Sequence, residues 1–168
     1  MTTDVNLPRG VAIFGGTGFI GRQLIRSMSL KQNALIRVFT RNTRMVSNCS
    51  NRNIKYIGSV SNVKKLINIY DEARIFILPS YIEGFPKVIS ESLARLKPII
   101  IFEDIKYVVN GRKGIFICKR NELSLKKNID YILNNYKSIQ KKIKSNFFYT
   151  KDNFNKKLVT CIENEFKN

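Results

Sequence analysis

Apolar and polar residues alternate along this chain in blocks, and the short apolar blocks have the length of buried strands. Longer amphipathic blocks of helical length separate most of them. Because parallel strands require crossover connections, this alternation predicts an α/β fold, a Rossmann-like doubly wound parallel sheet. The predicted strands cover residues 10–15, 35–40, 54–57, 74–78, 99–102 and 115–118.

The helical blocks carry apolar residues at helical spacing on one face. Two or three lysine-rich amphipathic helices are predicted from Glu122 onward, and another helix at 63–70. The predicted inner-face residues are Ile20, Leu24 and Met28 after the first strand, and Ile89, Leu93 and Leu96 between Pro86 and Pro98.

Residues 43–53 are polar, rich in turn-forming residues and without clear periodicity, so the main junction of the chain is expected there. The expected parts are an N-terminal tail (1–9), a dinucleotide-binding-like βαβ unit (10–50), an α/β region that shares its sheet (51–120) and C-terminal helices (121–168).

The composition excludes several classes of catalytic and metal-binding site. The chain contains no histidine, which excludes Ser-His-Asp and Cys-His catalysis and zinc sites with imidazole ligands. Cys49, Cys118 and Cys161 are far apart and form no Cys-x-x-Cys pair, so reduced thiols without a metal are expected. The N-terminus lacks a signal-peptide pattern, and no apolar run has the length of a membrane span. These features predict a cytoplasmic protein without a metal site.

The formal net charge of +18 would suit a polyanionic partner, but the basic residues are scattered rather than clustered. Lysine, asparagine and isoleucine are all abundant and all have A/T-rich codons, so base composition could produce much of the excess without selection for a partner. Nucleic-acid binding would rest on charge alone and is not expected. Peripheral membrane contact through the lysine-rich C-terminal helices stays an alternative to a solvated helix face.

A glycine-rich turn follows the first predicted strand and precedes a helix. In this context glycines allow a tight turn and the close approach of a pyrophosphate to the helix N-terminus. The stretch GVAIFGGTGFIG resembles the opening of the extended and atypical short-chain dehydrogenase/reductase family, which binds NAD or NADP. The resemblance implies a cofactor- or phosphate-binding set of Gly15, Gly16, Thr17, Gly18, Phe19, Ile20, Gly21, Arg22 and Arg41.

The region where NAD-binding proteins carry an acidic residue contains Arg41 and Arg44 instead, which favours NADP or no adenosine selectivity. This resemblance ends near residue 50, and the catalytic Tyr-x-x-x-Lys pair of the family is absent. A glycine-rich turn that only packs a helix on a sheet is the alternative.

Two glutamates flank a predicted strand-to-helix turn in the stretch EGFPKVISE. Glu83 follows a strand and Glu91 lies about one turn into the next helix, so both are expected to face the carboxyl edge of the sheet. From Arg52 onward the chain resembles the C-terminal, donor-binding domain of family 4 retaining glycosyltransferases of the GT-B fold, and the pair matches the Glu-x7-Glu motif of that family. Two solvated glutamates on an amphipathic helix are the alternative.

The resemblance implies that Glu83 lies by the transferred sugar as the catalytic residue and that Glu91 accepts hydrogen bonds from the nucleotide ribose. Gly84, Phe85, Pro86 and Lys87 are then expected to bring backbone N–H groups and the helix dipole to the donor diphosphate. Two departures from the family pattern are Leu96, where a small residue is usual, and EDIKYVV at 103–109, where a glycine-containing loop is usual.

Taken together, these features predict a hexosyltransferase-like protein with a UDP- or GDP-sugar donor. The acceptor-binding domain of the family has no counterpart here, so a partner chain is expected to supply it. The dehydrogenase-like unit is expected to take the place of the first unit of the donor domain, with Arg22 near the phosphates. An NADP-binding module without reductase chemistry and a non-catalytic fusion remnant are the alternatives.

Overall fold

A computed structural model describes residues 10–14, 22, 25, 36–40, 54–148 and 151–165. Within these residues, six strands form one sheet in the order β3-β2-β1-β4-β5-β6, and every neighbouring pair is parallel. The predicted doubly wound α/β fold is confirmed, because this is the Rossmann strand order. The strands are β1 (Val11–Phe14), β2 (Ile36–Phe39), β3 (Ile54–Ile57), β4 (Ile75–Leu78), β5 (Ile99–Phe102) and β6 (Ile115–Cys118).

The strand order reverses between β1 and β4. Strand β1 pairs with β2 on one side and with β4 on the other, with Ile13 opposite both Val38 and Ile77. Strands from the first forty residues and strands from the rest of the chain therefore belong to the same sheet. The carboxyl ends of β1 and β4 form a topological switch point, the usual ligand-binding place in such sheets.

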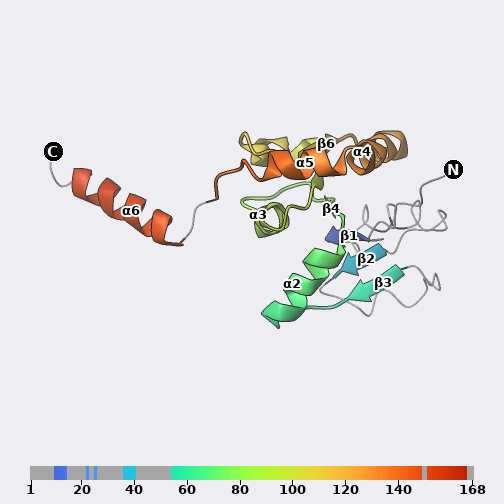
Figure 1. Cartoon of the computed structure of the whole chain (residues 1–168), viewed down its shortest axis with the longest axis horizontal. Coiled ribbons are helices and arrows are strands. Elements are labelled where there is room, and N and C mark those ends of the chain that lie inside the picture. The colour runs from blue at the N-terminus through green and yellow to red at the C-terminus, as the bar shows by residue number, and fades with distance from the viewer. Residues whose placement is uncertain are drawn as a thin grey trace.

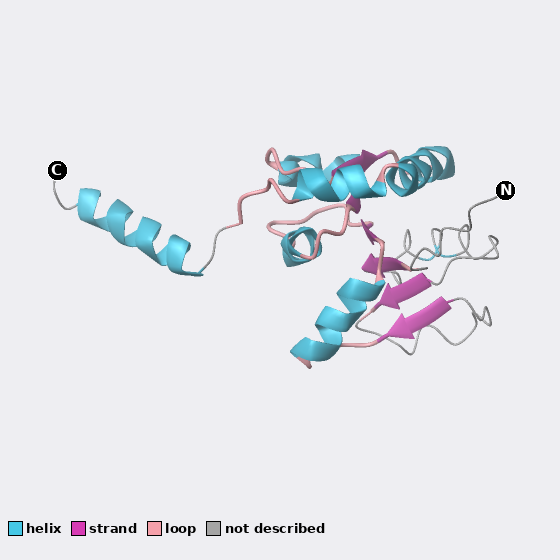
Figure 2. Cartoon of the chain, in the orientation of Figure 1, coloured by secondary structure: helices cyan, strands magenta, loops and turns pink. Residues whose placement is uncertain are grey.

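Helices flank the sheet, and further helices follow the last strand in the sequence. Figure 1 shows α4 and α5 at the β6 end of the sheet and α6 apart from the other elements, and Figure 2 shows a loop leading from α5 toward α6. The helices are α2 (Val63–Glu72), α3 (Lys87–Ala94), the 3-10 helix η2 (Glu103–Val109), α4 (Glu122–Asn134), α5 (Tyr136–Ile143) and α6 (Lys151–Glu165). In the described part of the chain, no helix is long and apolar enough to span a membrane.

The core is aliphatic around β4 and β5 and aromatic around β1. Each side chain of β4 and β5 is buried, as expected for inner strands of a sheet covered on both faces. Phe14 stacks on Phe39 with ring centroids 4.5 Å apart and on Phe76 at 5.7 Å. Tyr70 of α2 stacks on Phe76 at 4.7 Å, which fixes α2 against the strands beside the switch point.

Helix α3 ends earlier than the apolar pattern predicts. Ile89 and Leu93 are buried as predicted, but the helix stops at Ala94, and Leu96 lies beyond it with a positive φ of 57°. The Lys97 N–H donates to the Ser92 carbonyl at 2.9 Å, which places Leu96 at the left-handed position of a Schellman-type helix end. Glycine is usual at that position because it lacks a Cβ, which explains why the family prefers a small residue there. Leu24 and Met28 lie outside the described residues.

Candidate functional site

The loop after β4 and the first turns of α3 lie at the carboxyl edge of the sheet. Strand β4 lies between β1 and β5 in the sheet, so this loop emerges beside the topological switch point. Glu83 belongs to the loop and Glu91 to α3, so the two predicted carboxylates come from consecutive parts of one strand-loop-helix unit.

The loop holds Glu83 through both its side chain and its backbone. The Ser80 hydroxyl donates to Glu83 Oε1 at 2.5 Å. The Tyr107 hydroxyl lies against the backbone of Glu83, where it accepts from the N–H at 3.2 Å and donates to the carbonyl at 2.5 Å. Tyr107 lies in η2, so the segment EDIKYVV, which departs from the family pattern, directly supports the predicted catalytic residue.

Glu91 is exposed, but one of its oxygens has a buried donor. The Tyr70 hydroxyl donates to Glu91 Oε2 at 2.5 Å, and Tyr70 itself is only 3% exposed. Burial raises the pKa of the Tyr70 hydroxyl, and the hydrogen bond and the negative charge of Glu91 raise it further. Tyr70 therefore stays protonated, as a donor, throughout the neutral pH range.

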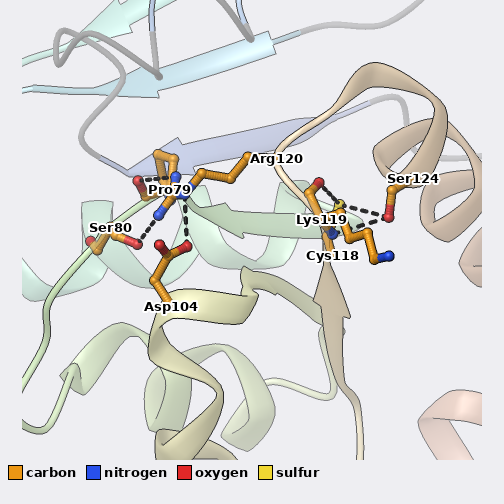
Figure 3. A network of polar contacts seen from close by, with 7 residues as sticks. All are labelled: Pro79, Ser80, Asp104, Cys118, Lys119, Arg120 and Ser124. Carbon is orange, nitrogen blue, oxygen red and sulfur yellow. Dashed lines mark hydrogen bonds and ion pairs between the residues drawn. The ribbon is translucent and has the colours of Figure 1, made fainter.

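Arg120, two residues after the end of β6, joins three segments at this edge of the sheet (Figure 3). Its Nη2 donates to the Ser80 carbonyl at 2.7 Å and its Nη1 to the Pro79 carbonyl at 3.3 Å. Its Nε donates to Asp104 Oδ2 of η2 at 2.7 Å. The guanidinium also lies 3.7 Å from the centroid of the Tyr81 ring. Arg120 thus holds the loop that carries Glu83 against η2 and the end of β6.

Arg112 makes a second set of contacts between η2 and α3. Its Nη2 donates to the Val108 carbonyl at 2.5 Å, its Nη1 donates to Ser90 Oγ at 3.2 Å, and its guanidinium lies 5.5 Å from the Phe85 ring. Burial lowers the pKa of Arg112, although an arginine stays charged at neutral pH even so. The exposed Phe85 is thereby connected to the same support as Glu83.

Cys118, at the end of β6, is a structural thiol. Its Sγ lies 3.0 Å from the Lys119 carbonyl and 3.5 Å from Ser124 Oγ (Figure 3), and the side chain is 1% exposed. Burial raises the pKa of the thiol, which keeps it protonated and unreactive at neutral pH. In the described part of the chain, no group of three or more cysteine, aspartate or glutamate residues could hold a metal ion.

The predicted diphosphate-binding residues surround the start of α3. Pro86 is the N-cap residue, and no side chain caps the helix. Lys87 and Phe85 are exposed, and a Cβ added at Gly84 would meet no atom within 4 Å. The N-terminus of α3 therefore has space and uncapped N–H groups, which suit an anion.

The predicted phosphate-binding residues near the N-terminus are almost all beyond the part that the structure describes. Arg22 is helical and exposed. Gly15, Gly16, Thr17, Gly18, Phe19, Ile20, Gly21 and Arg41 lie outside the described residues.

Four residues of the site were not predicted from the sequence: Ser80, Tyr70, Tyr107 and Arg120. Arg120 had a usable signal, because it lies two residues after the end of a predicted strand and so near the carboxyl edge of the sheet. The contacts of Tyr70 and Tyr107 join residues 21 and 24 positions apart, and no spacing rule predicts them.

The strand order and the loops at its switch point define a Rossmann-like α/β protein. The sequence model of the family Glycosyl transferases group 1 matches residues 41–148. The chain belongs to this family, and the predicted glycosyltransferase resemblance is confirmed.

Comparison with known proteins finds a similar glycosyltransferase sequence and, among others, two solved structures with a similar fold. An uncharacterized glycosyltransferase of Haemophilus influenzae is 27% identical over 97 residues, which cover 49% of this chain and 28% of that protein. A sucrose-phosphate synthase structure from Thermosynechococcus elongatus has a TM-score of 0.68 at 15% identity and covers 95% of this chain and 46% of that one. A UDP-GlcNAc 2-epimerase structure from Neisseria meningitidis, bound to UDP-GlcNAc, has a TM-score of 0.64 at 13% identity, with 95% and 44% covered.

The chain thus spans less than half the length of each of these relatives. Short-chain dehydrogenases/reductases also occur among the similar solved structures, where a representative covers 56% of this chain.

Proposed function

We propose that this protein binds a nucleotide-sugar donor at the carboxyl edge of β4 and takes part in hexosyl transfer with retention of configuration. The observation that carries the proposal is the pair of supported glutamates beside the switch point, where Ser80 and Tyr107 hold Glu83 and Tyr70 holds Glu91. Family membership adds support, since group 1 glycosyltransferases use nucleotide-sugar donors.

The chemistry of each residue type suits this role. A carboxylate accepts hydrogen bonds from two vicinal hydroxyls, so Glu91 would bind the ribose of the donor. The uncapped N-terminus of α3 would stabilise the diphosphate, both in the bound donor and as the leaving group. Glu83, one loop earlier, would lie by the transferred sugar.

The acceptor would be presented by a further domain or a partner chain, since the chain spans less than half the length of its structural relatives. The proposed donor is either a UDP-sugar or a GDP-sugar. The donor-binding step can be tested without the acceptor, because the residues proposed to bind the nucleotide belong to this chain.

The test is isothermal titration of the full chain with UDP, GDP, UDP-glucose and NADP. We expect Glu91→Gln, which keeps the shape of the side chain and removes its charge, to weaken nucleotide binding about tenfold or more. Glu163→Gln on α6 is the matched control, because Glu163 is also exposed but lies outside the site, and its affinity should equal that of the wild type.

Two further variants separate the parts of the proposal. Glu83→Gln should leave UDP affinity unchanged and reduce the additional affinity that the sugar of UDP-glucose provides. Nucleotide affinity that Glu91→Gln does not alter would contradict the proposal. Binding of NADP alone, lost in Gly18→Val, would instead assign the function to the glycine-rich turn.

A further inference from the structure

Tyr70 is a buried side chain with a single polar atom directed at the proposed ligand site. Its ring stacks on Phe76 of β4 at 4.7 Å and lies 6.1 Å from the Phe14 ring of β1. These two strands flank the switch point, so the position of the ring is set by the sheet itself. At the end of this rigid ring, the hydroxyl donates to Glu91 Oε2.

The position of Glu91 on its helix does little to fix the conformation of its side chain, so a hydrogen bond from Tyr70 matters. It lies on the exposed face of α3, where a long charged side chain samples several rotamers and loses their entropy when a ligand fixes one of them. The hydrogen bond from Tyr70 selects one arrangement before the ligand arrives. Among the described residues, Tyr70 is the one donor to this carboxylate, and it donates to Oε2.

We propose that Tyr70 is a positioning residue for nucleotide recognition, whose hydroxyl holds Glu91 so that its remaining oxygen, Oε1, accepts from the ribose of the bound nucleotide. This inference rests on the proposed function and adds the residue that preorganises its ribose contact. Because Tyr70 stays protonated at neutral pH, the donor is present under all conditions in which nucleotide binding is measured.

The test replaces Tyr70 with phenylalanine, which keeps the ring packing and removes only the hydroxyl. We expect UDP or GDP, whichever the wild type binds, to bind about tenfold more weakly. The matched control is Tyr136→Phe, which also removes a hydroxyl hydrogen bond, here the 3.0 Å bond to the Arg74 carbonyl, but on α5, away from Glu91. Its nucleotide affinity should be that of the wild type, and thermal unfolding should show that both variants fold.

Two comparisons distinguish positioning from a general structural effect. In a Glu91→Gln background, Tyr70→Phe should cause no additional loss of affinity, since the group that it positions is already altered. A 2′,3′-dideoxynucleoside diphosphate lacks the hydroxyls that Glu91 would bind, so wild type and Tyr70→Phe should bind it equally well.

Glu91→Asp gives a second variant that leaves the aromatic core intact. It keeps the charge but withdraws the carboxylate by one methylene from the Tyr70 hydroxyl, so it should lose affinity as Tyr70→Phe does. If Glu91→Gln weakens binding while Tyr70→Phe and Glu91→Asp do not, the role of Tyr70 is overturned and the proposed function stands. If the wild type binds no nucleotide, the proposed function and this inference are both overturned.

Discussion

Gly114 allows a direct test of how tightly α3, α5 and β6 pack together. It precedes β6 with a φ of 91°, and its carbonyl accepts from the Ile99 N–H at 3.0 Å. A Cβ at this position would overlap Ile143 Cγ1 and lie 2.7 Å from Ile143 Cδ1 and 3.0 Å from Leu93 Cδ2. Both neighbours are completely buried, so neither can move aside into solvent.

For Gly114→Ala we expect two additive losses. The left-handed backbone disfavours alanine by about 1 kcal/mol, and overpacking of the core adds about 2 kcal/mol. The free energy of unfolding should therefore fall by roughly 3 kcal/mol, which lowers the Tm by roughly 6 to 12 °C in a chain of this size.

Gly111→Ala is the matched control. Gly111 also has a positive φ, of 70°, but a Cβ there would meet no atom within 4 Å. Only the backbone loss of about 1 kcal/mol should remain. The free energies of unfolding are measured by urea denaturation monitored by circular dichroism. The variants are compared with the same m-value, the slope of the free energy against urea concentration. Equal losses in the two variants would refute the packing at Ile143 and Leu93 described here.

Two further predictions concern the supports of the proposed site. Arg120→Ala should lower the free energy of unfolding by about 2 kcal/mol, because it removes two hydrogen bonds to backbone carbonyls and the contact with the Tyr81 ring. Asp104→Asn should lower it by less than about 1 kcal/mol. Equal losses in urea denaturation would show that the loop contacts contribute nothing. Folding raises the pKa of Tyr70 above its ordinary value of 10.0, so the stability that its proton provides is complete below that pH and is lost as pH rises above it. Urea denaturation between pH 9 and 12 should therefore show that the free energy of unfolding falls less steeply with pH in Tyr70→Phe than in wild type. Equally steep falls in the two proteins would contradict the argument.

The strands and the main helices could be predicted from the sequence because the signals are local. Apolar runs such as Ile99–Phe102 are buried on both faces of the sheet, and the periodicity of α3 correctly places Ile89 and Leu93 in the core. The end of α3 could not be placed by periodicity, since Leu96 continues the apolar pattern but takes a left-handed backbone conformation. Whether a leucine adopts that conformation depends on its packing, because its side chain lies against the core.

The candidate site could be predicted only as far as its motif. The strand-loop-helix pattern correctly places Glu83 in the loop after β4 and Glu91 in α3. The groups that hold them come from elsewhere in the chain: Tyr107 from η2, Arg120 from the end of β6, and Tyr70 from α2. These contacts depend on the tertiary fold, and no local pattern encodes them.

The support of Glu83 constrains how it could take part in the proposed reaction. Its N–H already donates to Tyr107 and its carbonyl already accepts from the same hydroxyl, so its backbone has no free donor left for a sugar. Ser80 uses Oε1 of the side chain. The carboxylate of Glu83 is its strongest remaining acceptor for a bound hexose, since Oε2 accepts no hydrogen bond from the described residues and Oε1 accepts one. In the proposed site, the charge that Glu83 offers to a sugar is on this carboxylate, which is why Glu83→Gln is expected to alter sugar recognition without altering nucleotide affinity.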